Sequence, residues 1–208
     1  MLLIFASMSP TPQDDITQQE ILKAAIRLYQ KSGPSGVTMD DVAAAIGRSR
    51  TSLYYYYKNR DEIYQAVMDK IAWDMAAEIR EAAAAAETLW DKIYAFCYTK
   101  LEGSKDWKKF FTAFVGAMDA EEQSKHAKVM YGWHKKLVHH ESMILNEILA
   151  TQRKEMRAIS PEDQDTLVFL LYSGIRGIRR EIFELSDPHD LKAALRLLTD
   201  MVVKWLQE

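Results

Sequence analysis

Apolar residues recur along most of the chain at the three- and four-residue spacing of a helix face. The first clear stripe, Ile21, Ala25 and Leu28, ends at Gly33-Pro34, a pair that terminates helices. Proline is absent from residue 35 to residue 160, and no stretch sustains the two-residue alternation of a strand. The pattern therefore predicts an all-α protein of about nine helices.

Two short helices are expected after the first one. Thr38 supplies an N-cap hydroxyl for a helix that ends at Gly47. Ser49 then caps a third helix, in which Leu53 and Tyr57 form an apolar pair one turn apart. Three short helices with a glycine in the turn between the second and the third are typical of a helix-turn-helix.

Longer helices are predicted beyond residue 60, near residues 60–86, 88–101, 106–118, 124–157, 161–185 and 188–206. We therefore divide the chain into a disordered tail over residues 1–14, a helix-turn-helix domain over residues 15–60 and a larger helical domain over residues 61–208. The tail begins with a short apolar run that lacks the basic residues of a signal peptide, and Met8 offers an alternative translation start.

Basic residues are concentrated near the predicted third helix. Residues 1–60 carry seven basic and five acidic side chains, whereas the remainder carries twenty and twenty-five. The segment 48–60 contains Arg48, Arg50, Lys58 and Arg60 and no acid, and such a cluster attracts phosphate. A solvated helix face is the alternative explanation of this charge alone.

Cysteine and hydropathy point to a reducing compartment. Cys97 is the only cysteine, so no internal disulfide can form. No uninterrupted apolar stretch approaches the length of about 18 residues that a membrane-spanning helix needs. We therefore expect a cytoplasmic protein with no membrane partner.

Four consecutive tyrosines follow Leu53 in the predicted third helix. At about 100° per residue they cover about 300° of the helix circumference, so a helix that buries Leu53 and Tyr57 leaves the other three mainly outside. Phenols and hydroxyls beside basic groups can donate to DNA phosphates while the helix enters the major groove, and Arg50 can pair with a guanine. A helical domain that uses these tyrosines to contact another protein is the alternative.

The segments 37–43, 47 and 49–63 resemble the DNA-binding domain of the TetR/AcrR family of bacterial transcription regulators. The resemblance is specific over residues 21–67 and only architectural beyond them. It implies an all-helical homodimer with a variable C-terminal domain that binds small molecules and releases the operator. Many members have histidine at the position of Tyr56 and phenylalanine at that of Tyr57, so the resemblance does not specify the operator sequence.

The helix pattern and the resemblance together give one set of predicted DNA-binding residues. They are Thr38, Arg48, Ser49, Arg50, Thr51, Ser52, Tyr54, Tyr55, Tyr56, Lys58 and Arg60.

Sixteen aromatic residues follow residue 61, and most are expected to belong to the core. Some could line an apolar pocket between helices, where helical bundles commonly hold ligands. The candidates for such a pocket are Tyr94, Tyr98, Phe111, Phe114, Met130, Trp133, His134 and Tyr172. They favour an apolar or aromatic effector. No catalytic or metal-ligand motif is present, so we expect no enzyme activity, cofactor or metal.

The last two predicted helices are apolar on more than one side, which indicates burial on two sides. Glycine in the earlier of them permits a close approach. The predicted dimer-interface residues are Leu167, Leu171, Gly174, Ile178, Ile182, Leu197, Met201 and Trp205. One large core within a single chain is the alternative.

The sequence thus predicts a homodimeric DNA-binding regulator, a repressor released from a palindromic operator by a small ligand. The alternative is a helical small-molecule-binding or protein-interaction module that has no DNA target. The operator sequence, the regulated genes, the effector and the choice between repression and activation are not specified by the residues.

Overall fold

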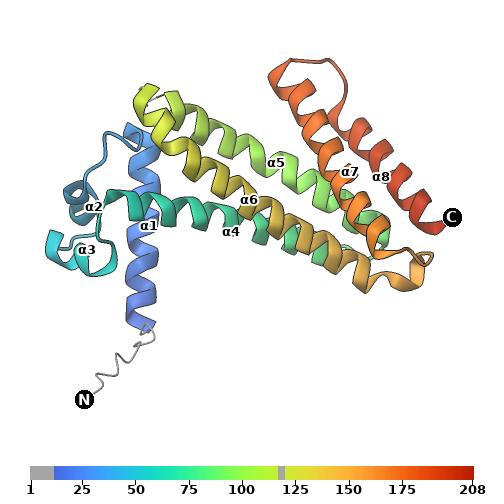
Figure 1. The fold of residues 1–208 in the computed structure, drawn as a ribbon, viewed down its shortest axis with the longest axis horizontal. Helices are drawn as coiled ribbons and strands as arrows, with labels where there is room; N and C mark the ends of the chain where they lie inside the picture. The colour runs from blue at the N-terminus through green and yellow to red at the C-terminus, as the bar shows by residue number, and fades with distance from the viewer. Residues whose placement is uncertain (1–11, 117–119) are drawn as a thin grey trace. The chain divides into compact units, whose positions relative to one another are not determined.

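A computed structural model describes residues 12–116 and 120–208, with side chains for residues 16–102, 127 and 129–208. The described residues are mostly helical and contain no strand (Figure 1), which confirms the all-α prediction. The α-helices are α1 (Pro12–Ser32), α2 (Met39–Ala45), α3 (Arg50–Tyr56), α4 (Arg60–Ala85), α5 (Leu89–Gly116), α6 (Ala120–Thr151), α7 (Pro161–Arg179) and α8 (Leu191–Gln207). A 3-10 turn, Arg153–Glu155, follows α6, and a π turn, Arg180–Glu184, follows α7.

The described residues form eight α-helices rather than about nine. The two helices expected near residues 88–101 and 106–118 are one helix, α5, which continues through Gly103. A single glycine inside a helix costs only about 1 kcal/mol relative to alanine, and no proline follows it here. At the other end of the chain, α1 begins at Pro12, within the predicted tail, while residues 1–11 lie outside the described part.

The chain divides into two compact units. The first comprises the residues up to Lys70 together with Phe110–Met130, and the second comprises Ile71–Lys109 together with Tyr131–Glu208. The predicted boundary after residue 60 falls inside the first unit. The reason is that the first turns of α4 are buried with the three N-terminal helices: the rings of Tyr29 and Tyr64 lie 6.2 Å apart, and both are buried.

The core of the first unit is formed mainly by the buried faces of α1, α2, α3 and the start of α4. Two glycines end its short helices. Gly33 and Gly47 have φ angles of 69° and 65°, in the left-handed region that side chains disfavour, and they follow α1 and α2. These turns produce the helix-turn-helix geometry that the sequence predicted.

The second unit has an apolar core to which α4, α5, α6, α7 and α8 all contribute. Its fully buried side chains include Ile79, Phe96, Ile144, Ile175 and Leu195. In Figure 1, α7 and α8 lie side by side. A Cβ atom added to Gly174 would meet the Leu198 side chain at 3.4 Å, so the absence of a side chain on α7 permits this close packing.

The predicted dimer seam on α7 needs a correction. Leu167 and Leu171 are buried in the core of their own chain, and Gly174 packs against α8 of the same chain. Ile178 is half-buried against this core, and Ile182 is half-buried in the π turn. Most of the predicted interface residues on α7 therefore pack against other helices of their own chain.

The three predicted α8 residues are all exposed. Leu197 and Met201 are each 63% exposed, and Trp205 is 38% exposed under the guanidinium of Arg157. On α7, the exposed apolar residues are Phe169 and Leu170, which were not among the predicted interface residues.

None of the helices in the described part of the chain combines the length and apolar character that a membrane crossing requires.

Candidate nucleic-acid interface

Helix α2 begins with a reciprocal cap. The Asp41 amide donates to Thr38 Oγ1 at 3.2 Å, and Asp41 Oδ2 accepts from the Thr38 amide at 2.8 Å and from Thr38 Oγ1 at 2.6 Å. The hydroxyl and amide of Thr38 stabilise the carboxylate, which lowers the pKa of Asp41 below its usual value. This arrangement confirms Thr38 as the N-cap, and Thr38 itself stays exposed.

Helix α3 is positioned by one cap and one buried side chain. The Ser52 amide donates to Ser49 Oγ at 3.2 Å, which confirms Ser49 as the N-cap. Leu53 is only 1% exposed and fixes the rotation of the helix about its axis. Tyr57 ends the helix and is half-buried, and burial raises the pKa of its phenol. The predicted burial is therefore confirmed for Leu53 and only partial for Tyr57.

Once Leu53 is buried, the phenols before Tyr57 are directed away from the core. Tyr54 is 40% exposed and Tyr55 is 75% exposed. Tyr56 is half-buried, and its ring meets that of Tyr55 edge-on at 5.1 Å between centroids. The exposed face predicted for α3 is thus present, with Tyr56 as its least exposed phenol.

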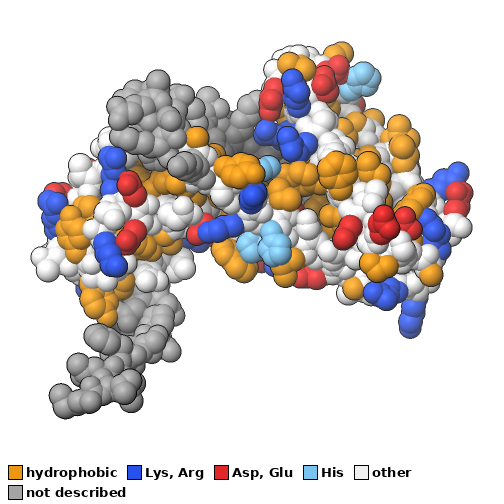
Figure 2. All heavy atoms as spheres, viewed as in Figure 1, with side chains coloured by type: hydrophobic (Ala, Val, Ile, Leu, Met, Phe, Trp, Pro, Cys, Tyr) orange, Lys and Arg blue, Asp and Glu red, His pale blue; other side chains and the backbone are white. Residues whose placement is uncertain are grey.

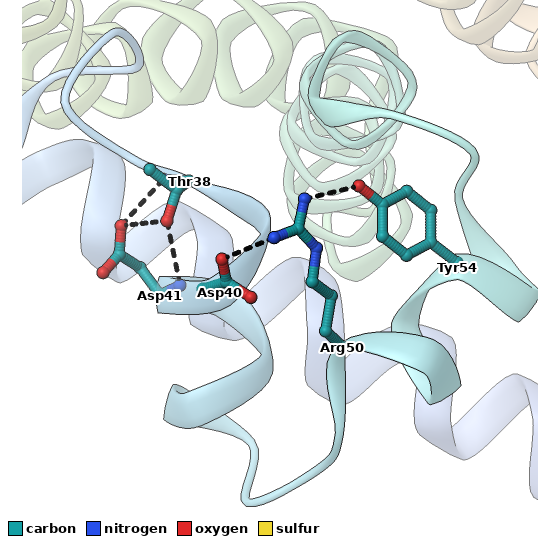
Figure 3. A network of polar contacts seen from close by, with 5 residues as sticks. All are labelled: Thr38, Asp40, Asp41, Arg50 and Tyr54. Carbon is teal, nitrogen blue, oxygen red and sulfur yellow. Dashed lines mark hydrogen bonds and ion pairs between the residues drawn. The ribbon is translucent and has the colours of Figure 1, made fainter.

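Arg50, the first residue of α3, bridges the two helices of the motif (Figure 3). Its Nη1 donates to Asp40 Oδ2 at 2.8 Å, and its Nη2 donates to Tyr54 Oη at 3.1 Å. The hydrogen bond to Tyr54 and then the nearby Asp40 carboxylate raise the pKa of Arg50. Since a guanidinium has five N–H groups, these two bonds hold its plane and leave three donors for another acceptor.

The remaining predicted residues differ in how they are held. Arg48, Thr51 and Lys58 are exposed, and the Lys58 amide donates to Glu62 Oε2, in the first turn of α4, at 2.8 Å. Arg60 is half-buried and donates from Nη1 to the Ser35 carbonyl at 3.2 Å, so this side chain helps to hold the loop after α1. Arg60 therefore also has a structural contact that the sequence did not indicate.

The surface over these helices is of mixed charge. In Figure 2, basic, acidic and apolar side chains are interspersed on the visible face of the N-terminal helices. Asp40 was outside the acid-free segment 48–60, but it pairs with Arg50 across the turn. The local excess of positive charge is therefore smaller than the linear sequence indicated, and it depends more on Arg48 and Lys58.

A family comparison matches this part of the chain. The family described as "Bacterial regulatory proteins, tetR family" matches residues 21–67, the span over which the sequence resemblance was specific. This N-terminal domain belongs to the TetR family. The exposed residues of α3 described above lie within the TetR-family domain.

Two curated relatives each align with about a quarter of the chain. The biofilm operon icaADBC negative transcriptional regulator IcaR of Staphylococcus epidermidis is 38% identical over 48 residues, which cover 23% of this chain and 26% of IcaR. The uncharacterized regulator YvaF of Bacillus subtilis is 39% identical over 57 residues, covering 27% and 30%. The matched part thus spans less than a third of these relatives.

Solved structures share the fold across both units. The TetR family repressor AlkX from Dietzia sp. strain DQ12-45-1b is 21% identical, with 97% of each chain covered and a TM-score of 0.58. At this identity the likeness concerns the fold alone. The similarity in fold includes the helices that follow the TetR-family domain.

The predicted pocket residues are not all in one unit, and those of the second unit form separate groups. Tyr94 and Tyr98 stack in a row with Trp90 on α5, and Trp90 Nε1 donates to Asp200 of α8 at 2.6 Å. Tyr172 Oη lies 3.4 Å from His134 Nε2. Trp133 is half-buried, Met130 belongs to the first unit, and the side chains of Phe111 and Phe114 lie outside the described residues.

One charged pair beside Tyr172 was not predicted from the sequence. Lys100 of α5 pairs with Glu141 of α6, and Lys100 Nζ lies 4.7 Å from the centre of the Tyr172 ring. Glu141 lies four residues after the buried Leu137 and three before the buried Ile144. That spacing places a carboxylate on an apolar helix face, and this pattern in the sequence could have indicated that Glu141 is buried.

Proposed function

We propose that this protein is a DNA-binding transcriptional repressor. In this proposal it acts as a homodimer on a palindromic operator and is released by a small ligand bound in the second unit. The observation that carries the proposal is the outward face of α3, whose Arg50, Tyr54 and Tyr55 are held on a TetR-family helix-turn-helix. The relative IcaR is itself a negative transcriptional regulator.

The chemistry of this face suits a DNA major groove. A helix of this size fits the groove, phenol and hydroxyl groups can donate to phosphate oxygens, and the remaining N–H groups of Arg50 match the O6 and N7 acceptors of guanine. Lys58 is exposed beyond the end of α3 and suits a phosphate contact. Arg50 is therefore proposed to read a base and Lys58 to position the domain.

The exposed apolar stripe on α8 is proposed as part of the contact between two copies of the chain. Leu197 and Met201 lie one turn apart and are largely exposed, which is unusual for large apolar residues on a helix with a well-buried opposite face. A two-fold symmetric pair would place two copies of α3 on half-sites about 34–36 Å apart, or a multiple of that spacing.

DNA binding is tested with the purified chain and a pool of genomic fragments in a gel shift at low salt. Lys58→Ala is expected to weaken binding to all duplexes alike and to reduce the salt slope by about one unit per domain, or about two for the dimer, whereas Arg50→Ala should relax the preference at one base position in each half-site. Lys154→Ala, which removes an exposed charge from the second unit, is the matched control. A chain that binds no fragment at low salt would disprove the proposal.

The dimer is tested by light scattering on the free chain. Met201→Lys is expected to shift the mass from two chains to one, because it places a charge in the proposed contact. Arg196→Lys changes an exposed position on the same helix and should leave the mass unchanged. A wild-type chain that remains single at micromolar concentration contradicts the symmetric proposal.

Release by a ligand requires coupling between the two units. Such couplings are typically about 1–3 kcal/mol and are reciprocal, so a ligand that weakens DNA binding must itself bind more weakly to the DNA-bound protein. Measuring ligand affinity with and without operator DNA tests this reciprocity. Equal affinities would show that the ligand does not control DNA binding.

A further inference from the structure

The interior of the second unit contains an ion pair that its apolar core does not require. Glu141 is 1% exposed and is the only charged residue that is fully buried among the described side chains; Lys100, its partner, is 12% exposed at the side chain. Removing two charges from water costs free energy, and well-packed apolar residues in their place often give equal or greater stability. This pair is therefore a candidate for a functional rather than a stabilising role.

The Glu141 carboxylate is only half satisfied. One oxygen, Oε1, accepts from Lys100 Nζ, whereas Oε2 is buried and has no hydrogen-bond partner among the residues that the structure describes. Burial raises the pKa of Glu141 and lowers that of Lys100, and the ion pair opposes both shifts. A buried acceptor without a donor is unfavourable, so Oε2 is a ready position for a hydroxyl or N–H group of a ligand.

Polar side chains lead from this pair toward solvent. The Tyr172 ring lies beside Lys100 Nζ, its hydroxyl is 3.4 Å from His134 Nε2, and Arg176 Cζ lies 5.9 Å from the same ring centre. Tyr172 and His134 are half-buried and Arg176 is exposed. The cluster thus extends from a buried acceptor to an exposed guanidinium within one unit.

The outer end of this cluster is electropositive. Burial, then Arg176, Lys100 and Arg179, lower the pKa of His134. Lys100 pairs with Glu141 and Arg179 pairs with Glu184 at 2.9 Å, so Arg176 supplies the excess positive charge here, which disfavours a cationic ligand and favours an anionic one. The flanking residues on the same helices are apolar and buried, including Leu101, Ile144 and Leu171.

We propose that the second unit binds a small hydroxylated carboxylic acid at Lys100, Glu141, Tyr172, His134 and Arg176. The ligand hydroxyl donates to Glu141 Oε2, and the ligand carboxylate faces Arg176 and His134. An apolar body, aromatic or aliphatic, joins the two groups along the buried flanks. The regulatory meaning of this binding rests on the proposed function, but the binding itself is measurable without DNA.

Matched probes test the proposal on the full chain. Isothermal calorimetry and thermal shift compare 4-hydroxybenzoate with benzoate and tyramine, and 6-hydroxyhexanoate with hexanoate and 6-aminohexanol. In at least one series the hydroxy acid is expected to bind on the order of tenfold to a hundredfold more tightly than its partner without the hydroxyl, and the amine should not bind. If no hydroxy acid is preferred in either series, or if the amines bind as well, the proposal is wrong.

A double variant separates binding from folding. Lys100→Met with Glu141→Met removes both charges together, so the chain is expected to keep or raise its melting temperature while losing the preference for the hydroxy acid. Glu147→Gln is the control, because Glu147 lies on the same helix and forms an exposed ion pair with Arg80. A double variant that folds and still prefers the hydroxy acid refutes the site.

The two proposals can fail independently. Failure to bind any DNA contradicts the repressor function and leaves hydroxy-acid binding through Glu141 intact. Binding of DNA without any hydroxy-acid preference contradicts the site and leaves the repressor function intact. A hydroxy acid that binds through Glu141 and lowers DNA affinity supports both.

Discussion

Replacing Asp40 with asparagine tests whether this carboxylate determines which base the third helix selects. Asp40 lies on α2 and holds Arg50 through the 2.8 Å bond from Nη1. Tyr54 holds the other terminal nitrogen at 3.1 Å. In the variant Asp40→Asn the ion pair becomes a hydrogen bond from the guanidinium to a neutral amide oxygen, which holds Arg50 less tightly than the carboxylate does. We expect weaker base discrimination combined with slightly stronger general DNA binding.

The two effects differ in size. A carboxylate about 10 Å from a phosphate, screened by water and salt, changes affinity by less than about twofold, so non-specific binding should rise only slightly. A more loosely held arginine side chain loses more conformational freedom when it pairs with a base, which we expect to cost about fivefold in discrimination per domain. In a symmetric dimer the two domains act together, giving roughly 25-fold.

The assay is selection from a randomised duplex pool, followed by anisotropy titrations on the selected and scrambled duplexes. Asp61→Asn is the matched control, because it removes an equal charge from an exposed position of the same domain. The variant should lose preference at one position in each half-site and keep its melting temperature within about 2 °C. An unchanged base preference would show that Asp40 does not orient Arg50, and a uniform loss at all positions would indicate damage to the fold.

Three further predictions concern stability. Leu53→Ala should destabilise the N-terminal domain by about 2–5 kcal/mol in urea unfolding, because it empties a fully buried position; a change below 1 kcal/mol would contradict this packing. The lowered pKa of Asp41 means that its cap stabilises α2 above the ordinary carboxylate pKa and that this contribution disappears as the pH falls through the lower native value. The protection of α2 amides relative to their intrinsic exchange rates should therefore fall on acidification, and Thr38→Ala should weaken this dependence. Gly174→Val should lower the melting temperature, whereas Gly177→Val should cost less, because among the described residues no atom beyond its own helix backbone and chain neighbours lies within 4 Å of an added Cβ; equal losses would refute the close packing of α7 on α8.

The local structure of the N-terminal domain followed from its sequence because each signal there acts over a few residues. Thr38 and Ser49 cap the helices that they precede, and Gly33 and Gly47 adopt the left-handed conformation that ends the helices before them. The joining of two expected helices into α5 was missed, since Gly103 weakens a helix without breaking it.

The site was predicted less completely because its contacts cross between elements. The sequence placed Arg50 at the start of α3, but its pairing with Asp40, ten residues earlier, depends on the angle between two helices. Likewise, periodicity could not say that the seam containing Leu167 and Leu171 faces the core of its own chain rather than a second copy. An apolar helix face indicates burial but not the partner that provides it.

The spacing of contacts along the chain also sets an order of assembly. The caps and turns of the N-terminal domain join residues a few positions apart, whereas the bond from Trp90 to Asp200 joins residues 110 positions apart. Short-range contacts close quickly, and long-range ones wait for the intervening chain. During synthesis the first three helices can form while the ribosome has still to produce α8, so the larger core is completed last.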